Sequence, residues 1–205
     1  MRIIIENATI LSGPEFEVVE GFIVIKDGLI QEIGSGSAPI GKKIDAKKAF
    51  VLPGLINAHT HIGDSIAKEA ALGKGLKEAV EPPFSIKYQI LQDTPENKLI
   101  ENMRVTAEDM LTSGITCFAD FREGCINGVN QLKKALNNLP IKNYILGRLE
   151  LYFNDKKLNK NEAELNFEKL TELENLLKIC NGYGLSAPSN FTDSAMHQIA
   201  EKANL

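Results

Sequence analysis

Two of the chain's three histidines lie one residue apart, at the end of the stretch VLPGLINAHTH that runs from Val51 to His61. The apolar residues before them predict a strand, in which residues i and i+2 point to the same side, about 6.5–7 Å apart along the backbone. The imidazoles of His59 and His61 could therefore converge on one metal ion, at metal–nitrogen distances of about 2.0–2.1 Å. The alternative is that the pair only ends a buried strand.

The composition is that of an ordinary globular chain and excludes several classes of function. The 205 residues are 43% hydrophobic and 24% charged, and the formal net charge is −4. This charge provides no electrostatic basis for binding nucleic acid or an anionic membrane. The N-terminal residues do not have the pattern of a signal peptide, and no apolar run approaches the length of a membrane span. We therefore expect a cytoplasmic protein with a small-molecule substrate.

The cysteines do not suggest a disulfide framework or a metal site. Cys117, Cys125 and Cys180 are odd in number and have no CxxC spacing, which favours reduced thiols in a cytoplasmic protein. The HxE and PCxxC signature of the cysteine-ligated zinc deaminases is absent, as are HExxH and the P-loop.

The chain changes character near Pro53. Residues 1–52 are short runs rich in β-branched residues, with an Asp27-Gly28 hairpin signal, and they predict a small antiparallel β unit. From Pro53 onward, apolar strand patterns alternate with helical patterns. The predicted strands are GLINAHTH, ITCFADF, NYILGRLEL and YGLSAPS, and the first long helix is expected to open at Thr94-Pro95-Glu96 with Thr94 as its cap. Four strand–helix units imply a parallel sheet, which fits an open doubly wound sheet or a (β/α) barrel.

These features together resemble the metal-dependent amidohydrolase superfamily. PGLINAHTHIGDS and SGITCFADFREG are similar to the cytosine deaminase and chlorohydrolase branch, in particular its archaeal members, and the resemblance covers essentially the whole chain. It implies an α/β fold, with residues 1–52 as the N-terminal part of a β-sandwich and residues 53–205 as the first four units of a TIM-type (β/α)₈ barrel. It also implies a divalent metal, zinc or alternatively iron, that activates water to attack a carbon–nitrogen bond other than a peptide bond.

The resemblance further implies that part of the site lies beyond Leu205. The family's remaining ligands and its HxxE acid/base motif match no position here, and His197 lies in a predicted helix. We therefore expect the chain alone to be inactive and to self-associate or form a homo-oligomer. The stretch Leu185–Ser189 lacks the lysine of binuclear relatives, which favours a mononuclear deaminase acting on a small heterocycle. A binuclear dihydroorotase or hydantoinase-like enzyme and a non-catalytic fragment remain the alternatives.

Polar residues at the ends of the predicted strands are the candidates for substrate binding. Arg122 and Glu123 follow the second strand, and Arg148 and Glu150 share one face of the third, where burying charge is costly unless it is paired or used on a ligand. Ser186 stands where many relatives place a histidine that binds substrate. The alternative for the charged four is that their ion pairs only shape the loops.

Asp64 is a candidate of a different kind. It follows His61 by three residues, so its carboxylate could orient that ligand without itself binding the metal. The alternative is that it is a solvated loop residue.

Overall fold

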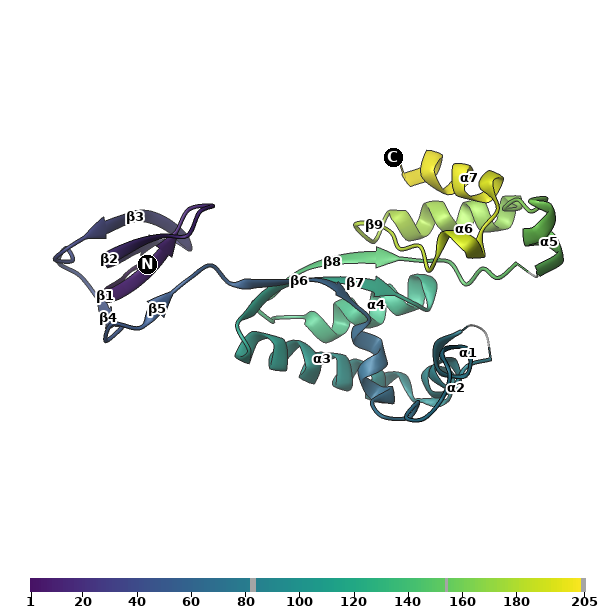
Figure 1. Ribbon diagram of the computed structural model, residues 1–205, viewed down its shortest axis with the longest axis horizontal. Helices are drawn as coiled ribbons and strands as arrows, with labels where there is room; N and C mark the ends of the chain where they lie inside the picture. Colours follow the sequence, from purple (N-terminus) through teal and green to yellow (C-terminus); the bar gives the residue numbers. More distant parts are fainter. Residues whose placement is uncertain (82–83, 154, 204–205) are drawn as a thin grey trace. The chain divides into compact units, whose positions relative to one another are not determined.

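The computed structural model describes residues 1–81, 84–153 and 155–203, which form two compact units. The first unit comprises Met1–Gly54 and the second Leu55–Leu205 (Figure 1).

The first unit is one mixed five-stranded sheet. Its strands are β1 (Arg2–Ser12), β2 (Glu17–Lys26), β3 (Leu29–Ser35), β4 (Lys43–Asp45) and β5 (Phe50–Val51). The order is β3-β2-β1-β4, with β5 also paired to β1. The Asp27-Gly28 hairpin is confirmed, since Lys26 pairs with Leu29 and both turn residues have positive φ.

The prediction of a purely antiparallel β unit is wrong. β4 and β5 pair with β1 in parallel, on the side of β1 away from β2, because the returning chain runs beside β1 in the same direction. Antiparallel pairing is confined to the β1–β2 and β2–β3 contacts.

The second unit contains a parallel four-stranded sheet in chain order. Its strands are β6 (Leu55–Thr60), β7 (Ile115–Arg122), β8 (Lys142–Gly147) and β9 (Gly182–Tyr183). The order has no reversal, unlike that of a doubly wound sheet. β8 and β9 are shorter than predicted, so Arg148 and Glu150 follow β8 rather than lying on it.

Helices follow the strands at the predicted places, with additional short ones between them. The long helices are α3 (Glu96–Thr112), α4 (Cys125–Leu136), α6 (Phe167–Leu177) and α7 (Asp193–Ala203), and His197 lies in α7 as predicted. The additional helical segments are η1 (Ile62–Ala67), α1 (Leu76–Val80), α2 (Ile86–Asp93), α5 (Asp155–Lys160) and η2 (Pro188–Asn190). Over the residues that the structure describes, none of the helices has the length and apolar character needed to cross a bilayer.

The start of α3 differs from the prediction. Pro95 is the N-cap residue, and Thr94 instead ends α2, where its backbone N–H and its hydroxyl both donate to the Ile90 carbonyl. The predicted threonine cap is therefore wrong, because α2 already occupies the residues before Pro95.

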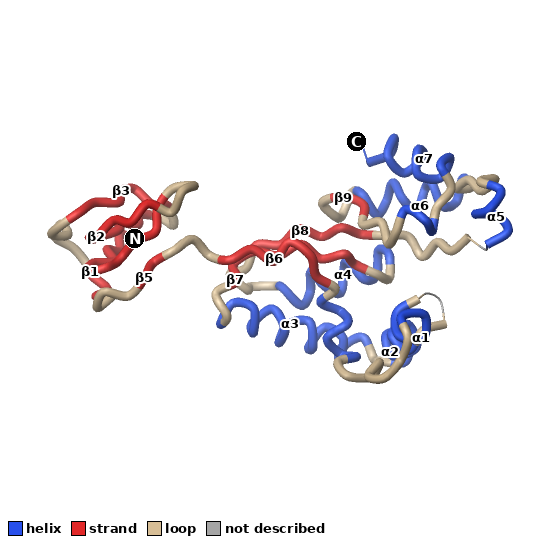
Figure 2. The backbone as a smooth tube through the Cα atoms, in the orientation of Figure 1, coloured by secondary structure: helices blue, strands red, loops and turns tan. Residues whose placement is uncertain are grey.

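The main core of the second unit lies between its four-stranded sheet and the helices. α3 packs against β7, and α4 packs against β7 and β8 (Figure 2). Along β7, the side chains of Phe118, Asp120 and Arg122 are buried, while the alternate residues Ala119 and Phe121 are partly exposed. Phe118 joins a core cluster with Met103 of α3 and Val129 of α4. Alternation along β7 therefore sends Arg122 to the helix-covered face and Phe121 to the other face.

Gly128 fits the first turns of α4 against the end of β7. A Cβ at this position would lie 1.7 Å from the Glu123 carbonyl oxygen, which is backbone and cannot swing aside. We expect Gly128→Ala to lower the free energy of unfolding by about 1–3 kcal/mol, as overpacking typically does. Urea denaturation measures the change. The matched variant is Gly182→Ala, whose Cβ would meet only the flexible Leu146 Cδ2 at 3.3 Å; equal losses in the two variants would contradict the steric argument.

Candidate metal centre

The two neighbouring histidines stand together at the carboxyl end of β6. His59 is exposed and His61, which directly follows the strand, is partly buried, so the pair does not simply end a buried strand. Their ring centroids are 5.3 Å apart, with an angle of 64° between the ring planes. A tetrahedral ion bound by one nitrogen of each ring would hold the ring centres about 5 Å apart, so the spacing fits joint ligation. The Phe121 ring stacks on His59, with centroids 4.3 Å apart.

Asp120 on β7 anchors the backbone around the histidines. Its side chain is fully buried, and Oδ1 accepts hydrogen bonds from Thr60 Oγ1 at 2.9 Å and from the Ile62 N–H at 2.6 Å. Thr60 precedes His61 and Ile62 follows it, so one carboxylate holds both flanks of that ligand. Burial raises the pKa of Asp120, and the Arg122 charge and the two hydrogen bonds oppose this effect. Sequence reasoning missed Asp120, although a carboxylate inside the apolar run ITCFADF was a signal for it.

Glu123 connects His61 to several cations. Its side chain is 3% exposed, and Oε1 lies 3.0 Å from His61 Nδ1, 2.5 Å from Lys87 Nζ and 3.2 Å from Arg148 Nη2. Oε2 lies 3.4 Å from Arg122 Nη2. Burial alone would raise the pKa of Glu123, but the His61 hydrogen bond and the Lys87, Arg122 and Arg148 charges together hold that pKa well below its usual range. Glu123 is therefore an anion in contact with a candidate metal ligand.

Lys87 of α2 is a second residue of the site that the sequence did not suggest. It is 8% exposed, and its ammonium also lies 2.7 Å from Asp64 Oδ2. Burial lowers the pKa of Lys87, but the Glu123 and Asp64 charges outweigh it and raise the pKa overall. His61, Asp64 and Glu123 offer ligand atoms within 4.8 Å of one another, a spacing that could hold a cation. Lys87 already brings a positive charge into that cluster.

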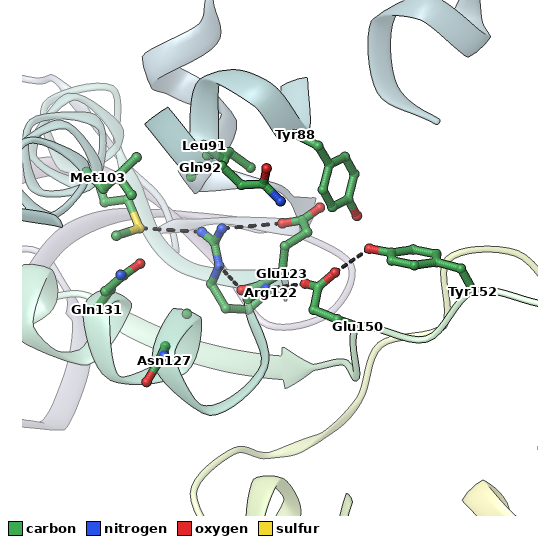
Figure 3. A pocket seen from close by; sticks show the side chains of 14 residues that line it. Tyr88, Leu91, Gln92, Met103, Arg122, Glu123, Asn127, Gln131, Glu150 and Tyr152 are labelled. Carbon is green, nitrogen blue, oxygen red and sulfur yellow. Dashed lines mark hydrogen bonds and ion pairs between the residues drawn. The ribbon is translucent and has the colours of Figure 1, made fainter. Parts of the chain in front are cut away.

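The other predicted site residues take different positions. Arg122 is 4% exposed; its guanidinium donates to the Glu123 carbonyl at 3.0 Å and lies 3.4 Å from Met103 Sδ (Figure 3). Arg148 donates to the Tyr88 hydroxyl as well as to Glu123. Glu150 accepts from the Gly124 N–H at 2.7 Å and from the Tyr152 hydroxyl.

Ser186 is exposed, and its hydroxyl accepts a hydrogen bond of 3.1 Å from Asn190 Nδ2. Glu123 and its partners His61, Lys87, Arg122 and Arg148 form the Glu123 cluster. Among the described residues, no hydrogen bond of Ser186 reaches this cluster. The structure therefore brings Arg122, Glu123 and Arg148 together around His61 and leaves Ser186 outside this network.

A cavity of about 350 Å³ lies beside the Glu123 cluster rather than over the two histidines. Glu123, Arg122, Glu150 and Tyr152 line it from the strand ends, and side chains of α2, α3 and α4 complete its wall (Figure 3). Neither His59 nor His61 is among its lining residues, so this cavity is distinct from the space between the two imidazoles.

Comparison with known proteins supports one family. The sequence profile of the amidohydrolase family matches residues 50–204. A protein of Methanothermobacter thermautotrophicus is 39% identical over 200 residues, covering 98% of this chain and 50% of that protein. A Pyrococcus furiosus protein named 5-methylthioadenosine/S-adenosylhomocysteine deaminase is 29% identical over 180 residues, covering 85% of this chain and 41% of that protein. The chain thus spans about half the length of these relatives.

A solved structure agrees in fold. A triazine hydrolase variant superposes with a TM-score of 0.69 at 18% identity, over 99% of this chain and 50% of that one. The similarity predicted from PGLINAHTH and ADFREG is confirmed by the profile match, which covers most of the chain. The chain belongs to the amidohydrolase family.

Proposed function

We propose that the chain contributes two metal ligands, His59 and His61, to an amidohydrolase that deaminates a small heterocyclic substrate. The observation that carries this proposal is the 5.3 Å separation of two imidazoles at the carboxyl end of a parallel strand. In parallel α/β folds, this is the end where active sites lie. We propose zinc as the ion, with iron as the alternative, and the four-stranded sheet as part of a (β/α)₈ barrel with the first unit as part of a β-sandwich.

The chain's own residues would prepare the site for that chemistry. A bound divalent ion supplies a Lewis acid and lowers the pKa of bound water toward neutrality. Stacking of Phe121 on His59 restricts the rotation of that imidazole. We propose Arg148, Glu150 and Ser186 as substrate contacts, because each is at least partly exposed at the ends of β8 and β9. Arg122 and Glu123 are nearly buried and bonded within the protein, so we propose that they shape the site without touching substrate.

The substrate class that we propose is an aminopurine nucleoside. The Pyrococcus furiosus relative bears the name of a deaminase for such compounds. Arg148 and Glu150 provide hydrogen-bond donors and acceptors suited to ribose hydroxyls. The binuclear cyclic amidohydrolase alternative has less support, because Leu185–Ser189 contains no lysine to bridge two ions.

The test uses a chimera in which this chain replaces the 200 matching residues of the Methanothermobacter thermautotrophicus protein. The zinc-loaded chimera is incubated with 5′-methylthioadenosine, S-adenosylhomocysteine, adenosine and cytosine, and released ammonia is measured. We expect turnover of an adenosine derivative that a chelator removes and added zinc restores. We expect none from the 205-residue chain alone, because catalytic zinc ordinarily has three protein ligands and a general acid/base contributes about 10²–10⁴-fold.

The controls separate chemistry from folding. His59→Ala in the chimera should abolish turnover, and His197→Ala, which changes the remaining histidine, should leave it intact. A folded, zinc-containing chimera that releases no ammonia from any compound, beside an active Methanothermobacter parent, would refute the proposed deaminase function. Turnover that persists in His59→Ala would refute the proposed ligand.

A further inference from the structure

We propose that Glu123 and Lys87 are positioning residues for the metal ligand His61. Glu123 holds the imidazole in the tautomer that leaves Nε2 free to bind metal. The Lys87 ammonium occupies the neighbouring acidic cluster of His61, Asp64 and Glu123, so that this cluster does not bind a second metal ion. This inference rests on the proposed metal site, and the experiments below separate its failure from the failure of that proposal.

The first step concerns the proton on His61. Nδ1 lies 3.0 Å from Glu123 Oε1, a hydrogen-bonding distance. An ionised carboxylate can only accept, so Nδ1 must carry the hydrogen in this contact. A neutral imidazole has a single N–H, which leaves the lone pair on Nε2. The tautomer and orientation of His61 are therefore set by a residue 62 positions away in the sequence.

The second step concerns the rigidity of Glu123. Its carboxylate is held by Lys87 of α2, Arg122 of β7 and Arg148 in the segment after β8, so donors from three separate parts of the chain fix it. The side chain is 3% exposed and has little freedom to turn toward solvent. A carboxylate fixed in this way can orient an imidazole without itself entering the metal's coordination sphere.

The third step concerns the acidic cluster of His61, Asp64 and Glu123. A zinc ion bound there would need oxygens at about 2.0–2.2 Å. The Lys87 ammonium already lies 2.5 Å from Glu123 Oε1 and 2.7 Å from Asp64 Oδ2, in the space that such an ion would take. The two cations cannot share this space. A cation of the chain itself, the Lys87 ammonium, therefore occupies the cluster. The metal ion then binds at the two imidazoles of His59 and His61 and not in this cluster.

The first experiment needs neither metal nor a variant. Long-range ¹H–¹⁵N spectra of the ¹⁵N-labelled 205-residue chain, recorded metal-free near pH 7.5, report which nitrogen of each histidine is protonated. We expect His61 to be the Nδ1–H tautomer, whereas an unconstrained imidazole gives a mixture that favours Nε2–H. A mixture or an Nε2–H tautomer at His61 would overturn the role of Glu123.

The second experiment compares two ion pairs of equal length. Glu123→Met with Lys87→Met removes one negative and one positive charge together, so the net charge of the chain is unchanged. Its matched control is Glu174→Met with Lys202→Met, because that exposed pair also has a 2.5 Å separation and lies on α6 and α7. Zinc affinity is measured by competition with a chromophoric chelator, and folding by circular dichroism.

We expect the Glu123/Lys87 double variant to bind zinc about 10–100-fold more weakly and to lose the single His61 tautomer, and the Glu174/Lys202 control to change neither. A folded Glu123/Lys87 variant with unchanged affinity and tautomer would overturn the inference. If His59→Ala leaves zinc binding unchanged, the proposed metal site fails instead. If His59→Ala weakens binding and the Glu123/Lys87 variant does not, only the positioning role fails.

Stoichiometry tests the role of Lys87 separately. With excess zinc, we expect one equivalent on the unmodified chain and a second equivalent on Lys87→Met, which removes the ammonium that lies between the Asp64 and Glu123 carboxylates. Adding Asp64→Asn to Lys87→Met should remove the second equivalent. A second equivalent already present on the unmodified chain and lost in Asp64→Asn would show that the ammonium does not exclude an ion.

Discussion

Replacing His59 by alanine is expected to weaken zinc binding by about 100-fold or more. Structural zinc sites with four ligands bind with about 10–16 kcal/mol, or about 2.5–4 kcal/mol per ligand, and each 1.4 kcal/mol is a factor of ten. His59 and His61 face each other with ring centroids 5.3 Å apart, so each should carry a comparable share. His61→Ala should therefore have an effect of the same size.

His197→Ala is the matched control, because it removes the chain's third histidine from α7. Competition with a chromophoric chelator gives the three dissociation constants. We expect His197→Ala to bind zinc as tightly as the unmodified chain. An equal loss in all three variants would indicate nonspecific binding, and no loss in His59→Ala would mean that the paired imidazoles are not the site.

Asp120→Ala is expected to lower the free energy of unfolding by about 3–5 kcal/mol, the usual loss when one partner of a buried charged network is removed. The variant leaves the Thr60 hydroxyl and the Ile62 N–H without their acceptor. It also leaves the buried Arg122 without a carboxylate that lies 3.8 Å away. Urea denaturation followed by circular dichroism measures the loss.

Two variants test the cause of this loss. Asp120→Asn keeps an oxygen that can accept from Thr60 and Ile62 but removes the charge, so it should lose clearly less stability than Asp120→Ala. Asp109→Ala removes an exposed carboxylate on α3 and should change stability by no more than about 0.5 kcal/mol. A change at Asp120→Ala as small as that at Asp109→Ala would contradict the anchoring role.

The sequence by itself determined the features that depend on neighbours along the chain. The i, i+2 spacing of His59 and His61 on a strand places both rings on one side, because strand geometry has a period of two. The same local logic predicted the Asp27-Gly28 hairpin and the alternation of strands and helices after Pro53. PGLINAHTH was specific enough to identify the family, which the profile match over residues 50–204 confirms.

Only the tertiary structure decided which distant residues serve the histidines. Glu123 is 62 residues from His61, and Lys87 is 36 residues from Glu123. Asp120 is 58 residues from Ile62, whose N–H donates a hydrogen bond to it. No periodicity relates such positions, because their meeting depends on how α2 and the ends of β6, β7 and β8 pack together. The neighbours Arg122 and Glu123 show the same limit. The sequence offered both as candidates for substrate binding or for ion pairs that shape the loops. It could not show that Arg122 is buried against α3, or that Glu123, just past the strand, lies beside His61.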